Sequence, residues 1–133
     1  MTAIIDKLAW IHIQNRKILL TRSYGKTLFY LPGGKREAGE SDQQALLREI
    51  QEELSVALQA DSLRYAQTFR SQADGKAEGI DVQLTCYFGQ ADGLPQASSE
   101  IEQLAWVDSS NQQLCSLAAL QVFHWLKQQD LID

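Results

Sequence analysis

The segment 33-GGKREAGESDQQALLREIQEELSV-56 carries the clearest structural pattern in this 133-residue chain. It opens with two glycines, which allow backbone conformations closed to other residues. A helical pattern follows from Ser41, which can cap the helix because Gln44 three residues later completes a capping box. Apolar residues then recur at helical spacing, at Leu46, Leu47, Ile50 and Leu54. The segment therefore predicts a glycine-rich turn that leads into an amphipathic helix.

Three carboxylates share one face of this predicted helix. Glu49, Glu52 and Glu53 lie within about 100° of one another at 3.6 residues per turn. They repel one another by a few tenths of a kcal/mol per pair, and a bound divalent cation would offset that repulsion. The alternative is a solvated acidic face with lysines nearby. Because Gly33 and Gly34 would bring backbone carbonyls close to the carboxylates, the two features together favour a metal-assisted phosphate site.

The spacing of these residues resembles the Nudix box, Gly-x5-Glu-x7-Arg-Glu-U-x-Glu-Glu-x-Gly-U, where U is aliphatic. Eight of the nine fixed positions match between Gly34 and Val56. The exception is Ser55, which stands where the family has glycine. A glycine just past a helix end usually supplies a left-handed residue, so serine there would cost about 1 kcal/mol, or the helix would end differently.

The resemblance implies an α/β (α+β) fold, a three-layer α/β/α sandwich with a mixed sheet. It also implies hydrolysis of nucleoside diphosphates linked to another group, with Mg²⁺ or Mn²⁺ as cofactor. By their positions in the motif, Glu52 and Glu53 are expected metal ligands, joined by the Gly33 carbonyl. Glu49 is expected to be a further ligand or the general base that activates water.

Other residues acquire roles from the same resemblance. Arg48 is expected in the catalytic site, where charge-assisted hydrogen bonds would orient the glutamates. Glu40 is expected to be structural or to support the residues that bind the metal. Glu100 lies ahead of Trp106-Val107, where some family members place a further catalytic or metal-binding glutamate, although an exposed loop acid fits equally well and Glu102 competes with it.

Substrate recognition outside the box has only weak signals. Arg22 at the end of one predicted strand and Arg70 in another are candidate phosphate ligands. Aromatic side chains that could stack on a base, but that more often belong to a core, are Phe29, Tyr30 and Tyr87. The two histidines, His12 and His124, are expected to be structural.

Strand-like segments flank the box on both sides. Before the box, strands are predicted at Lys7–Ile13, Ile18–Thr21 and Leu28–Leu31. After it, strands are predicted at about Leu63–Ser71, Ile80–Gln90 and Leu104–Val107, with a closing helix from about Leu114 to Gln129. The length and the absence of a linker predict one domain over residues 1–133.

The charge of the chain limits its partners. A net charge of −5 and a pI near 5.0 argue against binding to duplex nucleic acid or an anionic membrane. Neither a signal peptide at the first residues nor an apolar stretch long enough to span a membrane is visible, so a cytoplasmic location is expected. The oligomeric state has no signal in the sequence.

The predicted partner is a nucleotide-like small molecule. The absence of a further predicted domain favours a nucleoside triphosphate, cleaved to monophosphate and pyrophosphate. ADP-ribose or another nucleotide sugar is the alternative, because the box binds metal and diphosphate and does not read the base. Two non-enzymatic alternatives are a nucleotide-sensing module and a cation-binding structural protein, and the complete set of box carboxylates argues against a module that has lost activity.

Overall fold

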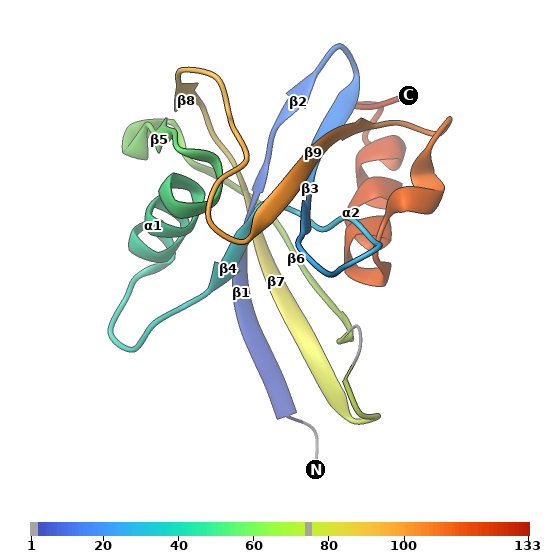
Figure 1. Ribbon diagram of the computed structural model, residues 1–133, viewed down its shortest axis with the longest axis horizontal. Coiled ribbons are helices and arrows are strands. Elements are labelled where there is room, and N and C mark those ends of the chain that lie inside the picture. Colours follow the sequence, from blue (N-terminus) through green and yellow to red (C-terminus); the bar gives the residue numbers. More distant parts are fainter. Residues whose placement is uncertain (1–2, 74–75) are drawn as a thin grey trace.

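Two helices cover opposite faces of a central mixed β-sheet in the computed structural model, which describes residues 3–73 and 76–133 (Figure 1). Met1 and Thr2, where no signal peptide is expected, lie outside the described residues. This arrangement confirms the mixed α+β fold with helices on both sides of a sheet. Within the described part of the chain, no helix combines the length and hydrophobicity needed to cross a membrane.

Short connections link most of the elements. The strands are β1 (Ala3–Ile11), β2 (Ile13–Gln14), β3 (Lys17–Ser23), β4 (Gly33–Lys35), β5 (Ala57–Leu58), β6 (Arg64–Gln72), β7 (Ile80–Phe88), β8 (Ala91–Asp92) and β9 (Ile101–Val107). The α-helices are α1 (Asp42–Leu54) and α2 (Leu117–Gln128), and single 3₁₀ turns span Ala60–Ser62 and Gln112–Leu114. Apart from one segment before the box, the predicted strands and helices are confirmed, with ends shifted by a few residues.

The main sheet has the strand order β4-β1-β7-β6, in which β1 and β7 run parallel and the other pairs antiparallel. A second sheet, β2-β3-β9, is antiparallel throughout, and β5 pairs with β8. Helix α1 packs against β1 and β4, while α2 packs against β6 (Figure 1). Helix α1, which carries most of the box, therefore lies beside the edge strand β4, which begins with Gly33 and Gly34.

Strand β1 separates two hydrophobic cores because its side chains alternate between the two faces of the sheet. Leu8 and Trp10 are fully buried in the core beneath α1. Ala9 and Ile11 are buried in the core beneath α2. By the same alternation Lys7 is directed to the α2 side of the sheet.

The predicted strand Leu28–Leu31 is wrong. Only single bridges form there, between Tyr30 and Thr21 of β3 and between Phe29 and Cys115. The two residues pair with different neighbours on opposite sides, so no ladder extends along the segment. Pro32, which has no N–H to donate, follows directly.

Helix α1 begins and ends as its local sequence dictates. At its start, the Ser41 hydroxyl accepts from the Gln44 N–H at 3.1 Å and the Gln44 side chain accepts from the Ser41 N–H at 2.9 Å, which confirms the capping box. At its end, Ser55 adopts the left-handed conformation, with φ 55° and ψ 34°. Serine thus occupies the geometry that glycine provides in the motif, and its hydroxyl contacts the Ser98 hydroxyl at 3.1 Å.

We expect Ser55→Gly to stabilise the protein by a few tenths to about 1 kcal/mol, because glycine adopts the left-handed conformation without a Cβ penalty. Urea unfolding would show a higher midpoint at an unchanged slope. Ser55→Ala is the matched control, since it removes the hydroxyl contact with Ser98 but keeps the Cβ. A glycine variant no more stable than the alanine variant would contradict this account of the helix end.

Candidate active site

The glycine turn lies directly against the carboxylates of α1. Gly33 has φ 144°, and its N–H donates to Glu53 Oε1 at 3.0 Å. Gly34 lies so close to the Glu49 carboxylate that a Cβ at this position would overlap it. The pairing of β4 with β1, in which Gly34 lies opposite Leu8 and Gly33 opposite Ala9, fixes this approach. The two glycines therefore bring strand and helix into contact at the acidic face.

Arg48 connects the box residues through a set of charge-assisted hydrogen bonds. Its guanidinium binds Glu40 in a bidentate manner at 2.7 and 2.8 Å and donates to Glu49 Oε1 at 2.7 Å. It also donates to the Lys35 carbonyl at 3.1 Å. Hydrogen bonds from Arg48 and from the Glu37 N–H hold the pKa of Glu40 down at about 2. Arg48 thus fixes Glu49 from one side and anchors the loop through Glu40.

The ion pair of Glu40 with Arg48 predicts a contribution to stability that is lost in acid. Because the pKa of Glu40 is depressed from 4.5 to about 2, its contribution is complete above pH 4.5 and is lost as the pH falls towards 2. We expect Glu40→Gln to unfold more easily than the native protein at pH 6 and to approach it at pH 2 to 3. Urea midpoints across this pH range would test it, with Glu78→Gln, an exposed acid in a turn, as the control. A constant difference across the range would contradict the assignment.

Glu53 is the buried member of the acidic face, with 7% of its surface exposed. Burial raises its pKa to about 8, the Gly33 N–H opposes the rise, and the nearby Glu100 and Glu49 carboxylates add to it. The interaction between the Glu53 and Glu100 carboxyls raises the pKa of Glu53 and contributes to lowering that of Glu100. A hydrogen bond with the Ser99 side chain is the main cause that lowers the pKa of Glu100.

The loop before β9 brings Glu100 to this position. The Ser98 N–H donates to the Glu53 carbonyl at 3.0 Å, and the Ser98 hydroxyl donates to the Glu52 carbonyl at 2.6 Å. The Tyr24 N–H donates to the Glu100 carbonyl at 2.9 Å from the other side. Glu100 is therefore held at the C-terminal end of α1 by backbone contacts that the sequence pattern does not reveal.

The carboxylates are arranged unequally. Those of Glu49, Glu53 and Glu100 line one cavity, whereas the Glu52 side chain is 53% exposed and lies 3.6 Å from Arg48 Nη1. Among residues 3–73 and 76–133, no group of three His, Cys, Asp or Glu side chains has the geometry of a metal site. The donor set nevertheless fits a hard divalent cation, because three carboxylates line the same space and the buried Glu53 feels the charge of both others.

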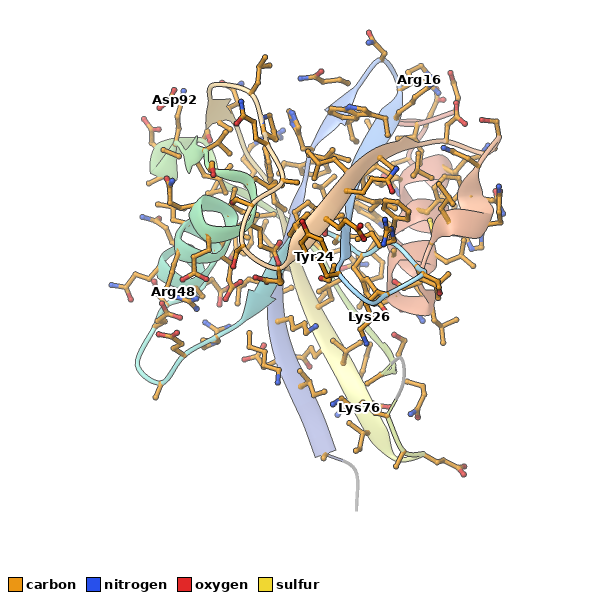
Figure 2. The ribbon with its side chains drawn as sticks, in the orientation of Figure 1. Arg16, Tyr24, Lys26, Arg48, Lys76 and Asp92 are labelled. Carbon is orange, nitrogen blue, oxygen red and sulfur yellow. The ribbon has the colours of Figure 1, made fainter. Side chains whose placement is uncertain are left out.

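The cavity has a volume of about 480 Å³, which is within the range of small-molecule sites. Its lining combines carboxylates with lysines and aliphatic side chains. Its charged lining residues are Lys7, Lys26, Lys35, Lys76, Glu49, Glu53 and Glu100. Figure 2 shows Arg48 on the α1 side of β1, and Lys26 and Lys76 on the other side. A ligand with negative charge, bound through a cation at the carboxylates, matches this lining.

The predicted substrate residues are distributed differently. Arg22 pairs with Glu102 at 2.7 Å and Arg70 pairs with Asp81 at 3.5 Å, and neither lines the cavity. Phosphate binding by these two arginines stays a prediction. Tyr30 lines the cavity, while Phe29 is buried in the core beneath α2.

The remaining aromatic and histidine candidates have structural contacts. The Tyr87 hydroxyl donates to Asp42 at 2.7 Å, and His12 stacks on Trp10 with ring centroids 4.4 Å apart. The cavity lysines were absent from the sequence prediction. Lys35 could have been predicted, because it directly follows Gly33-Gly34 in the sequence. Lys7 could not, because it lies near the site only through the pairing of β1 with β4.

Comparison with known proteins gives a consistent result. The sequence model of the NUDIX domain matches residues 8–124. No match to a curated protein is found. Among solved structures, the Escherichia coli ORF135 protein is 26% identical with a TM-score of 0.74, and the match covers 99% of this chain and 96% of that protein.

Two further structures match over smaller shares of the compared chains. A MutT NUDIX hydrolase from Burkholderia pseudomallei is 26% identical with a TM-score of 0.65, over 77% of this chain and 81% of that one. A bifunctional NMN adenylyltransferase/ADP ribose pyrophosphatase from Francisella tularensis, complexed with AMP and a Mn ion, is 23% identical with a TM-score of 0.70. That match covers 97% of this chain and 42% of the other, and shows the shared fold.

Proposed function

The chain belongs to the Nudix hydrolase family, and from this premise we propose that it hydrolyses a phosphoanhydride bond in a nucleoside diphosphate linked to another group, with Mg²⁺ or Mn²⁺ as cofactor. The observation that carries the proposal is the convergence of Glu49, Glu53 and Glu100 on one cavity beside the glycine turn, a cavity that lysines also line. Acidic groups for a cation and basic groups for a phosphate chain are both required by this chemistry.

We assign the box residues as follows. Glu53 and Glu52 would hold the cation together with the Gly33 carbonyl, with Glu52 turned inward from its exposed position on α1. Arg48 holds Glu49 in place through the 2.7 Å hydrogen bond. When bound, the cation would screen the phosphate charge and lower the pKa of a bound water.

A carboxylate beside the cation then accepts a proton from the attacking water. Glu49 and Glu100 are the two candidates, because both line the cavity next to Glu53. Glu49 is fixed by its hydrogen bond from Arg48, whereas Glu100 interacts with the buried Glu53. Glu49→Gln and Glu100→Gln would separate them, since the base has the larger effect on kcat and a ligand the larger effect on the Mg²⁺ concentration needed for half activity.

A nucleoside triphosphate, cleaved to monophosphate and pyrophosphate, is the leading substrate class. The cavity volume of about 480 Å³ accommodates a nucleotide. ADP-ribose or another nucleotide sugar is the second class, supported by the activity named for the Francisella tularensis protein, which has the same fold. A cytoplasmic location agrees with either class of substrate.

The test is metal-dependent release of phosphate and pyrophosphate from a panel of nucleoside triphosphates, nucleotide sugars and dinucleoside polyphosphates. A coupled phosphatase would reveal cleaved diphosphates. We expect turnover of one class that requires Mg²⁺ or Mn²⁺ and stops with a chelator. Glu78→Gln, outside the cavity, should retain the native rate. A folded protein that a nucleotide stabilises but that turns over none of these compounds would be a sensor, and the proposal would be wrong.

A further inference from the structure

In the part of the chain that the structure describes, the lysines that line the cavity form no ion pair, whereas every arginine except Arg64 forms one. In the described residues every ion pair is formed by an arginine. Within residues 3–73 and 76–133, the ammonium groups of Lys7, Lys26, Lys35 and Lys76 make neither an ion pair nor a hydrogen bond. All four line the same cavity as the carboxylates.

Lys7 and Lys35 are neighbours across the pair of strands β1 and β4. They lie directly opposite one another in the antiparallel pair of β1 and β4, one step from Leu8 and Gly34. Opposite residues in such a pair share a face, with Cβ atoms about 4.5–5.5 Å apart, and like charges there destabilise the sheet. An anion between the two ammonium groups would remove that repulsion.

Lys7 is also half-buried, whereas Lys35 is exposed. Burial lowers the pKa of Lys7, Lys35 lowers it further, and Glu53 and Glu49 act in the opposite direction. Lys7 therefore lies within electrostatic range of both the second lysine and the proposed cation site. A phosphate chain bound through a cation at Glu53 would pass close to it.

We propose that Lys7, together with Lys35, binds a further phosphate group of the substrate and so selects nucleotides with three or more consecutive phosphates. The inference rests on the proposed hydrolase function and names its substrate class. A nucleotide whose diphosphate carries a neutral sugar would leave the half-buried ammonium without a partner. A site built for a polar partner discriminates strongly against a ligand that lacks it.

The first experiment compares two substrates of one nucleoside, its triphosphate and its diphospho-ribose derivative. In Lys7→Met we expect kcat/KM for the triphosphate to fall about tenfold to a hundredfold, mainly through KM, because a charge-assisted contact is lost. The value for the diphospho-ribose compound should change by less than about threefold. Lys7→Arg should keep most of the preference for the triphosphate, and Lys17→Met, an exposed lysine outside the cavity, should behave as the native protein.

A second measurement needs no turnover. In Mg²⁺, inorganic tripolyphosphate should raise the melting temperature of the native protein more than inorganic pyrophosphate does. This difference should disappear in Lys7→Met and shrink in Lys35→Met, which alters an exposed residue and guards against a folding defect at Lys7. The Lys17→Met protein should retain the full difference.

The outcomes separate the two proposals. Turnover with an unchanged preference for the triphosphate in Lys7→Met, or equal thermal shifts from both inorganic phosphates in the native protein, would overturn the role of Lys7 and leave the hydrolase intact. Absence of turnover combined with a Lys7-dependent thermal shift would remove the hydrolase and retain the phosphate site.

Discussion

Glu53→Gln is expected to reduce kcat/KM by about a thousandfold or more, since loss of a cation ligand removes several kcal/mol of transition-state stabilisation. Glutamine keeps the size of the side chain and can still accept the Gly33 N–H, which now bonds Glu53 at 3.0 Å. The loss would therefore reflect the missing charge. Steady-state kinetics in Mg²⁺ and Mn²⁺ on the identified substrate would measure it.

The same substitution should stabilise the cation-free protein at high pH. The pKa of Glu53 is raised from 4.5 to about 8, so folding favours its protonated form. The resulting destabilisation is absent below pH 4.5, grows as the pH rises, and is complete above pH 8. Replacement by the neutral amide should thus raise the free energy of unfolding by roughly a few kcal/mol at pH 9 in a chelator, and by little at pH 4.

Chemical unfolding of both proteins in a chelator at pH 4 and pH 9 would test this. Glu52→Gln is the matched control, because its side chain is exposed and its removal should change stability little at either pH. If Glu53→Gln is no more stable than the native protein at pH 9, burial of the charged Glu53 carboxylate does not destabilise the fold, contrary to this account. Full activity of the same variant would exclude Glu53 as a ligand.

Gly33→Ala is expected to cause the largest loss of stability, roughly 3 to 5 kcal/mol. At φ 144° a side chain is strained, and a Cβ would overlap the carbonyl oxygen of Leu8 on the neighbouring strand. The backbone of β1 cannot move aside, because Leu8 is fully buried beneath α1. Thermal and urea unfolding would measure the loss.

Gly34→Ala provides the matched comparison. A Cβ at this position meets only the carboxylate end of Glu49, a side chain that can turn away. We expect a smaller loss of stability but a clear loss of activity, because Glu49 would leave its hydrogen bond to Arg48. Equal stability of the two alanine variants would show that β4 can shift away from β1, contrary to the packing described above.

The local features of the site could be predicted from the sequence because they depend on residues close together in the chain. The Ser41–Gln44 capping box fixed the start of α1, and the spacing from Gly34 to Val56 identified the family. For Ser55 the motif left two possibilities, a left-handed serine or a different helix end, and the structure shows the left-handed conformation. Each of these depends on backbone geometry within a few residues.

Features that depend on strand register were not accessible in this way. Arg22 sits at the end of β3, but the register of β3 with β9 shifts between Arg22 and Ser23, and Ser23 rather than Arg22 lines the cavity. Lys7 joins the site only because β1 pairs with β4. Glu100 approaches Glu53 because Ser98 binds the end of α1, a contact between residues far apart in the chain.

The alternation of β1 makes the two sides of one strand independent targets for changing the protein. Ile5 and Lys7 face the cavity, whereas Leu8 and Trp10 belong to the core beneath α1 and hold the box helix in place. A library of variants at the first pair can therefore explore new ligands while the scaffold that positions the acidic residues is kept. Variants with a changed substrate range can therefore be sought on this strand, because one face can be altered while the other is kept unchanged.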